Sequence, residues 1–167
     1  GVWIQESTGT QVGDVGAGNL ISGNVGAGVR AIVSPSTSLL ANTIGLVKDG
    51  SSALGNDEGG VVIDGSNAAT VGGTTAGTGN VISGNVGSGV KVLGSNEALI
   101  ARNTIGTNIS GTKAVPNTVY GVELINATNS TVGGPTSDSA NLISGNTDRG
   151  VYTHGVLSSN NLISANS

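Results

Sequence analysis

An internal repeat is the feature that most constrains what this chain can fold into. The hexapeptide Asn19–Asn24 recurs almost unchanged as Asn80–Asn85 and Asn141–Asn146, each time 61 residues further along. The tetrapeptide Asn42–Gly45 recurs as Asn103–Gly106 at the same spacing. A fixed period of this kind is typical of proteins in which each repeat is one structural unit that stacks on the next.

Each 61-residue super-repeat divides into two units of unequal length. A Gly-Val pair opens each unit, and successive pairs are 27, 32, 29, 32 and 29 residues apart. An Asn-x-Ile motif lies further along each unit, and a third aliphatic position falls between the two. We expect this third position at Val12, Leu40, Val71, Leu99 or Ile100, Val132 and Leu157. The chain therefore holds six units, each with three short apolar segments.

Composition decides what these segments form. The chain has 30 Gly but no Phe, Met or Cys, so its core must consist mainly of Val, Ile and Leu. No apolar pattern repeats at 3.6 residues, and the short β-branched segments separated by Gly, Asn and Ser are typical of strands and turns. Because a short strand buries little by itself, it must stack on its copies at about 4.8 Å per rung. The sequence predicts an all-β, right-handed parallel β-helix of six three-stranded rungs, with residues 1–167 forming a single domain.

Period-2 alternation separates inward from outward side chains. In the Gly-Val strands, Val2 and Ile4 and their counterparts point inward. The residue between them points outward, which predicts an exposed column of Trp3, Arg30, Val62, Lys91, Glu123 and Tyr152. The Asn-x-Ile motifs predict a second inward column of Ile21, Ile44, Ile82, Ile105, Ile143 and Ile163.

The repeated Asn and Gly residues have a structural interpretation. An Asn side chain at the same corner of every rung can hydrogen-bond its copies above and below. We expect one such amide ladder, made of Asn19, Asn42, Asn80, Asn103, Asn141 and Asn161. The glycine that opens each Gly-Val strand is expected to supply a positive φ at a corner.

The strings Gly79–Asn85 and Asn103–Thr112, with their copies, carry a family resemblance. The chain resembles the right-handed parallel β-helix proteins of the pectin-lyase-like superfamily, and most of all the repeat arrays of large secreted bacterial surface proteins. The resemblance spans essentially the whole chain and implies an extracellular or cell-surface location. It does not imply one function, because the superfamily holds lyases, hydrolases, epimerases, adhesins and stalks.

The outward column is the first candidate binding site. Its aromatic ends and charged middle could bind a glycan by stacking and hydrogen bonding, through Trp3, Arg30, Lys91, Glu123 and Tyr152. The column lacks the paired carboxylates that glycoside hydrolysis requires. A mixed, solvated sheet face is the alternative interpretation.

Two 14-residue loops, Leu46–Gly59 and Thr107–Tyr120, occupy equivalent places in alternate units. The first loop offers Asp49, Asp57 and Glu58 as candidate calcium ligands, because hard cations need clustered oxygen atoms. A solvated acidic loop explains the same residues, and no cofactor is otherwise indicated. The single histidine, His154, is predicted to lie in a surface turn. Three glycosylation sequons begin at Asn108, Asn126 and Asn129.

Charge and hydropathy exclude several partners. The net charge is −4 without basic clusters, which argues against nucleic acid. No apolar run approaches the roughly 20 residues that span a bilayer, so we expect no membrane insertion.

We therefore predict a non-catalytic structural repeat module of an extracellular bacterial protein: a stalk, fibre or adhesin shaft. The alternative is a carbohydrate-active module, namely a polysaccharide lyase, an epimerase or a glycan-binding domain. Both ends of the sequence fall within the repeat, so we expect a segment of a longer array. The expected partner is another copy or a neighbouring repeat, stacked end to end.

Overall fold

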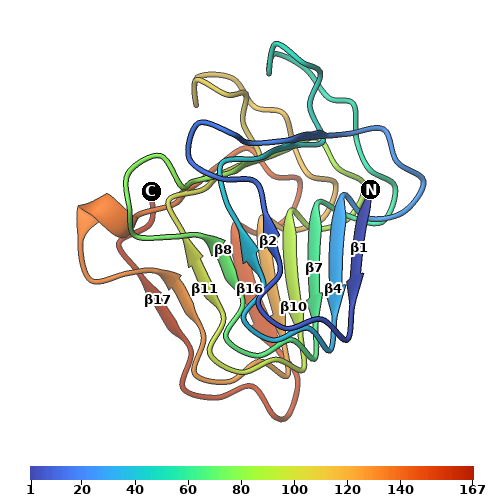
Figure 1. Cartoon of the computed structure of the whole chain (residues 1–167). Helices are drawn as coiled ribbons and strands as arrows, with labels where there is room; N and C mark the ends of the chain where they lie inside the picture. Colours follow the sequence, from blue (N-terminus) through green and yellow to red (C-terminus); the bar gives the residue numbers. More distant parts are fainter.

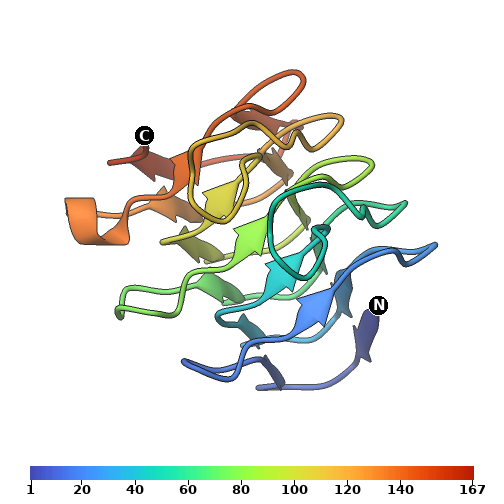
Figure 2. The same ribbon diagram turned by 90° about the horizontal axis from the view of Figure 1, so that it is seen from above.

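The computed structural model describes residues 1–167 and shows a parallel β-solenoid (Figure 1). Three parallel sheets run along the stack, and each turn contributes one strand to each sheet until the sixth turn, which contributes to the first two. The rungs lie one above another with little lateral shift (Figure 2). The predicted fold class, a parallel β-helix of about six rungs, is confirmed.

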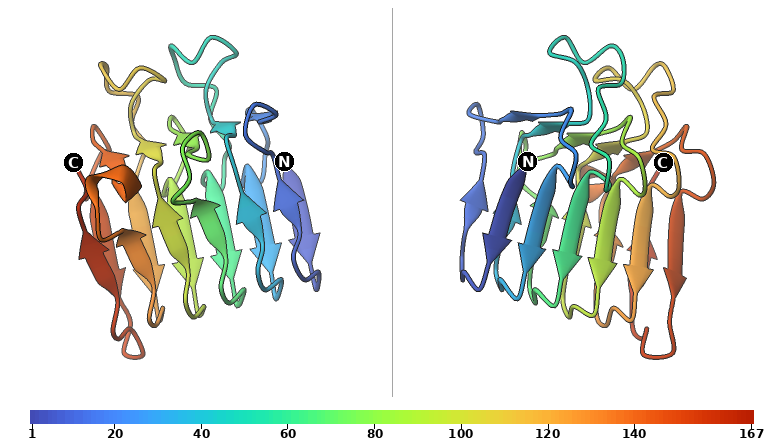
Figure 3. Two further views of the ribbon diagram at one scale, coloured as in Figure 1. Left: turned by 60° about the vertical axis from the view of Figure 1, so that its left-hand side comes forward. Right: turned by 90° about the vertical axis from the view of Figure 1, so that its right-hand side faces the viewer.

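The first sheet holds the Gly-Val strands. Its order is β1-β4-β7-β10-β13-β16, and the strands lie side by side in register (Figure 3). All six begin at the valine of a Gly-Val pair, as predicted. Their bounds are β1 Val2–Gln5, β4 Val29–Ile32, β7 Val61–Asp64, β10 Val90–Leu93, β13 Val122–Ile125 and β16 Val151–His154.

The other two sheets consist of shorter strands. The second sheet comprises β2 Gln11–Val12, β5 Ser38–Leu39, β8 Thr70–Gly72, β11 Leu99–Ala101, β14 Thr131–Gly133 and β17 Leu162–Ser164. The third comprises β3 Leu20–Ile21, β6 Thr43–Ile44, β9 Val81–Ile82, β12 Thr104–Ile105 and β15 Leu142–Ile143. The one helical turn is a 3-10 turn at Ser137–Ser139, so no helix has the length and apolar character that crossing a bilayer requires.

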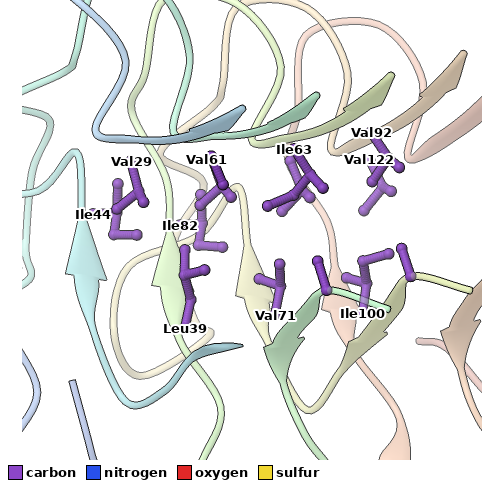
Figure 4. Close-up of a cluster of buried hydrophobic side chains, with 14 of the residues drawn as sticks. Val29, Leu39, Ile44, Val61, Ile63, Val71, Ile82, Val92, Ile100 and Val122 are labelled. Atoms are coloured by element: carbon purple, nitrogen blue, oxygen red, sulfur yellow. The ribbon is translucent and has the colours of Figure 1, made fainter. Parts of the chain in front are cut away.

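The core lies between the three sheets and consists of aliphatic side chains. Val29 and Val61 of the first sheet point toward Ile44 and Ile82 of the third and Leu39 of the second (Figure 4). Twenty-one buried residues form one continuous cluster. Each side chain stacks on its counterpart in the next rung, so the columns extend along the whole solenoid.

The second sheet corrects the predicted position Leu40 and decides between the two alternatives Leu99 and Ile100. Leu39, not Leu40, aligns with Val12 and is fully buried. Ile100, one of the two alternatives at its position, aligns with Val132.

At the sixth rung the inward residue is Ile163, which aligns with Val132, whereas Leu157 is 67% exposed in a turn. The prediction that Ile163 belongs to the isoleucine column of the third sheet is therefore wrong, because β17 pairs in the second sheet. The other five members do align there.

The predicted asparagine ladder exists, with one member replaced. The backbone N–H and Nδ2 of Asn80 both donate to Oδ1 of Asn103, at 3.0 and 2.9 Å, and the same bonds link Asn19, Asn42 and Asn141. The sixth member is Asn166, which accepts from Asn141, and not Asn161.

Asn161 begins an Asn-x-Ile motif, as the ladder residues do, but lies at another corner of the rung. Its Oδ1 accepts from the backbone N–H of Ser130, and its Nδ2 donates to the carbonyl of Ala127. The reason is path length. Asn161 follows Gly150 by 11 residues, whereas the ladder asparagines follow their glycines by 14 to 20. The chain has therefore travelled only as far as the second sheet.

A second amide ladder runs along the opposite end of the third sheet. Its members are Asn24, Asn56, Asn85, Asn117 and Asn146, joined by the same paired bonds. The sequence analysis missed it, although three members end the repeated hexapeptide. The other two lie within the long loops, where no local motif marks them.

Five of the six glycines of the Gly-Val pairs are required for space, and none for a positive φ, which corrects the prediction. None of the six has a positive φ. A Cβ on Gly28 would lie 2.6 Å from Cγ2 of Ile44 and 2.9 Å from Nδ2 of Asn56. Glycines with positive φ lie instead at the ends of strands in the second and third sheets, as at Gly72, where φ is +83°, and Gly106, where φ is +93°.

We expect Ile82→Ala to destabilise the fold by about 2–5 kcal/mol, because Ile82 is fully buried and its loss leaves a cavity in mid-stack. The matched control is Val81→Ala on the outer face of the same strand, expected to cost well under about 1 kcal/mol. Denaturant unfolding measures both. Equal effects would show that the inward and outward faces are misassigned.

We expect Asn80→Ala to cost about 1–3 kcal/mol, because it leaves buried backbone and amide groups without partners. Asn67 is the control: it is exposed, accepts one bond from the Asn96 N–H, and lies outside both ladders. Asn67→Ala should change the free energy of unfolding little, since water can replace that bond. A ladder without structural weight would give the two variants the same stability.

Candidate functional site

The alternation of long and short units produces a groove on the solenoid. The loops 46–59 and 107–120 project from the stack, two rungs apart (Figure 1). Each begins as a small antiparallel turn, and the N–H of Ile109 donates to the carbonyl of Gly50 at 3.1 Å, which joins them. The turn 83–89 of the rung between them is short. A groove of about 500 Å³ therefore opens above it, next to β10 and β13.

The groove is lined by polar and charged side chains from three successive turns. Asp57 and Glu58 come from the first loop, Ser88 from the short turn, and Tyr120 from the second loop. Lys91 and Glu123 project into the groove from the strands below. They belong to the outward column, whose predicted order is confirmed by the strand register. Val62 of the same column is not exposed as expected, since it is only 4% exposed.

Glu123 is the most enclosed charge of the groove. It is 8% exposed although it lies on the outer face of β13. The hydroxyl of Ser88 donates to its Oε2 at 2.9 Å, Lys91 Nζ lies 3.7 Å from Oε2, and His154 Nε2 lies 3.2 Å from Oε1. Neighbouring rungs on both sides thus hold one carboxylate in place.

The prediction that His154 lies in a surface turn is wrong. It is the last residue of β16, where it aligns with Ile125. Its imidazole stacks on Tyr152, with ring centroids 4.5 Å apart. Its local sequence, Tyr-Thr-His-Gly, carries no information about the neighbouring rung.

An aromatic cluster extends the groove toward the sixth rung. The rings of Tyr120 and Tyr152 lie 4.9 Å apart, and the guanidinium of Arg149 lies 4.8 Å from the Tyr152 ring and 5.8 Å from the Tyr120 ring. Cation–π contacts of this length fix the orientation of both partners. Tyr152, His154 and Arg149 therefore form one ordered surface beside Glu123.

The other end of the column carries Trp3, which is 62% exposed. The Arg30 guanidinium lies 5.6 Å from its ring, and Arg30 Nη2 lies 3.7 Å from Oε2 of Glu58. The candidate residues Trp3, Arg30, Lys91, Glu123 and Tyr152 thus lie on one continuous face, and the Arg30–Glu58 ion pair links that face to the first loop.

The predicted calcium ligands are not brought together. All three lie on the first loop, but only Asp57 and Glu58 line the groove, whereas Asp49 does not and its Oδ1 accepts from Ser51 N–H. No group of three or more Asp, Glu or His side chains is arranged to hold a metal ion. Hydrogen bonds from the Ser51 hydroxyl and backbone N–H lower the pKa of Asp49 below its ordinary value. The charged form of Asp49 is therefore stabilised by hydrogen bonds within its own loop.

The sequons lie on the surface in different settings. Asn129 is exposed, and its Nδ2 donates to Asn96 Oδ1. Asn108 is half-buried, and its Oδ1 accepts from the N–H groups of Thr112 and Lys113. Asn126 is half-buried with φ of 49°, and its Oδ1 accepts from Leu157.

Comparisons with protein families, with curated proteins and with solved structures return no match to this chain.

We expect Glu123→Ala to destabilise the fold by about 1–3 kcal/mol, because it leaves the buried Ser88 hydroxyl without its acceptor and removes the counter-charge of Lys91. Glu58→Ala is the matched control, since Glu58 is exposed and its single ion pair is worth about 0–1 kcal/mol. Denaturant unfolding distinguishes them. Equal losses would mean that Glu123 is an ordinary surface charge.

Proposed function

We propose that this chain is a non-catalytic structural repeat module of an extracellular or cell-surface bacterial protein, serving as a stalk, fibre or adhesin shaft. The observation that carries the proposal is where the repeated residues are used. The two asparagine ladders, the aliphatic columns and the space-limited glycines all make contacts between rungs. Because the repeated residues stack each rung on the next, adding repeats makes the structure longer.

The physical basis is that each rung contacts only its neighbours. In such quasi-one-dimensional proteins, stability is a sum of rung and interface terms, so rungs can be added without redesign. The stack advances about 4.8 Å per rung, which makes a shaft of roughly 29 Å from six rungs. Membership of the pectin-lyase-like superfamily and a secreted bacterial origin are part of this proposal, and the repeated strings at Gly79–Asn85 and Asn103–Thr112 support them.

Inserting a second copy of residues 42–102 after Arg102 tests the proposal, because it adds one super-repeat in register. We expect a folded protein about 9.6 Å longer, the height of two rungs, with stability at least equal to the original. Small-angle X-ray scattering measures the length and denaturant unfolding the stability. A control insertion of the same residues in scrambled order should not extend the fold. If the in-register insert fails to lengthen the protein, the shaft proposal is wrong.

A glycan-binding module is the second candidate, favoured by the ordered outer face. Exposed Trp3 at one end and the Tyr120–Tyr152 pair at the other can stack on sugar rings. Lys91, Glu123 and Glu58 beside the groove can hydrogen-bond sugar hydroxyls. Such a module would bind along the shaft without chemistry.

Calorimetry with polygalacturonate and alginate oligosaccharides separates these candidates. Binding that Trp3→Ala and Tyr152→Ala both weaken, but Trp3→Phe retains, would establish the glycan site. Turnover of either polymer that is lost in Glu123→Gln or Lys91→Ala would overturn the non-catalytic proposal and favour a lyase or epimerase.

A further inference from the structure

The groove between the two long loops carries more negative than positive charge. Three carboxylates line it, those of Asp57, Glu58 and Glu123, and the only cationic side chain among the lining residues is Lys91. Lys91 Nζ lies 3.7 Å from Oε2 of Glu123, so this ammonium already has a counter-charge within the groove. The potential inside the groove therefore attracts a cation and repels an anion.

Asp57 is the lining carboxylate without a partner. The charge of Glu58 is matched by Arg30, whose Nη2 lies 3.7 Å from Oε2 of Glu58, and the charge of Glu123 is matched by Lys91. The Asp57 side chain is exposed at the groove and takes part in none of the ion pairs of the chain. One bound cation at this position would complete the charge balance of the groove.

The cations beside the groove are occupied elsewhere. The guanidinium of Arg149 lies 5.8 Å from the Tyr120 ring, and its Nη1 lies 2.7 Å from Oδ2 of Asp148. His154 contacts Oε1 of Glu123 from the following rung and is not part of the lining. Neither side chain is therefore available to pair with the free carboxylate on the first loop.

The rest of the lining fits a sugar ring next to such a cation. Ser88, Thr118 and Tyr120 contribute hydroxyl groups, and Val86 and Val119 contribute apolar surface. The ring of half-buried Tyr120 can stack on a sugar. A groove of about 500 Å³ lies within the usual size range of small-ligand sites, in which a few polar groups on an apolar surface fix the orientation of the ligand.

The walls of the groove are held in place by the solenoid itself. Both long loops project on the same side of the stack (Figure 3), and the N–H of Ile109 joins the second loop to the carbonyl of Gly50 in the first. The short turn 83–89 lies between them. Because the walls are already joined, binding needs little further ordering of the chain.

We propose that this groove binds an oligosaccharide of amino sugars, with one protonated amine against Asp57 and Glu58 and a sugar ring on Tyr120. The inference deepens the glycan-binding candidate and rests on it, and it is independent of the shaft function. The same charges disfavour a polyuronate, because the carboxylates of that polymer would be repelled by the two acidic residues of the first loop.

Three β-1,4-linked trisaccharides that differ only at carbon 2 test the proposal: those of glucosamine, N-acetylglucosamine and glucose. Calorimetry at a pH where the glucosamine amines are protonated measures their affinities. We expect the glucosamine trimer to bind at least about five-fold more tightly than the two neutral trimers, the effect of about one exposed ion pair. Added salt should reduce this preference, because it screens exposed charges.

Asp57→Asn is the residue-level test. It removes the charge but keeps the shape, and no ion pair of the fold depends on Asp57. We expect it to lower the affinity for the glucosamine trimer about three- to five-fold and to leave that for the glucose trimer unchanged. Glu97→Gln is the matched control, since exposed Glu97 lies in the turn after β10 and does not line the groove. An equal loss in both variants would overturn the proposal, because the net charge of the chain would then explain the binding.

The outcomes also separate this inference from the candidate on which it rests. Equal affinity for the three trimers, weakened by Tyr120→Ala, would keep the glycan site and overturn its selectivity for an amine. Binding of none of the three would overturn both. Neither result bears on the shaft, whose test is the length gained with an inserted super-repeat.

Discussion

The buried asparagine amide is the interaction on which the rest of this structure depends. A side-chain amide in an apolar interior costs free energy unless its donors and acceptor are all paired. Asn80 meets that requirement only because Asn42 lies directly below it and Asn103 directly above. One rung cannot satisfy its own amide. The ladder therefore demands the same residue at the same height in every turn, and the repetition of the sequence follows from that demand.

The groove arises because the units alternate in length. Long loops in the second and fourth turns flank a short turn in the third, so the surface is hollowed where the repeat is interrupted. The distinctive chemistry lies there: Glu123 is enclosed by Ser88, Lys91 and His154 from separate rungs. The repeated residues build the scaffold, and the residues that interrupt the repeat line the groove. A glycan-binding role would be compatible with the proposed shaft function.

The amide ladder gives the stack a direction. The strands of each sheet are parallel, and each ladder asparagine donates its backbone N–H and one Nδ2 hydrogen to Oδ1 of the asparagine in the following rung. Each rung therefore presents the same groups to the rung that follows it, so consecutive rungs stack in only one orientation.

The sequence alone determined the parallel β-solenoid, the six Gly-Val strands, the outward column and five of six ladder members, because these depend on period and alternation, which are visible along the chain. Tertiary structure decided the rest. Asn161 and Asn166 are both candidates for the sixth ladder position, and the length of chain after Gly150 decides which of them reaches that corner. The hydrogen-bond and ion-pair partners of Glu123 come from different rungs. The members of the second ladder in the long loops also come from different rungs. Contacts between rungs depend on which residues reach the same height, and only the three-dimensional path of the chain sets that height.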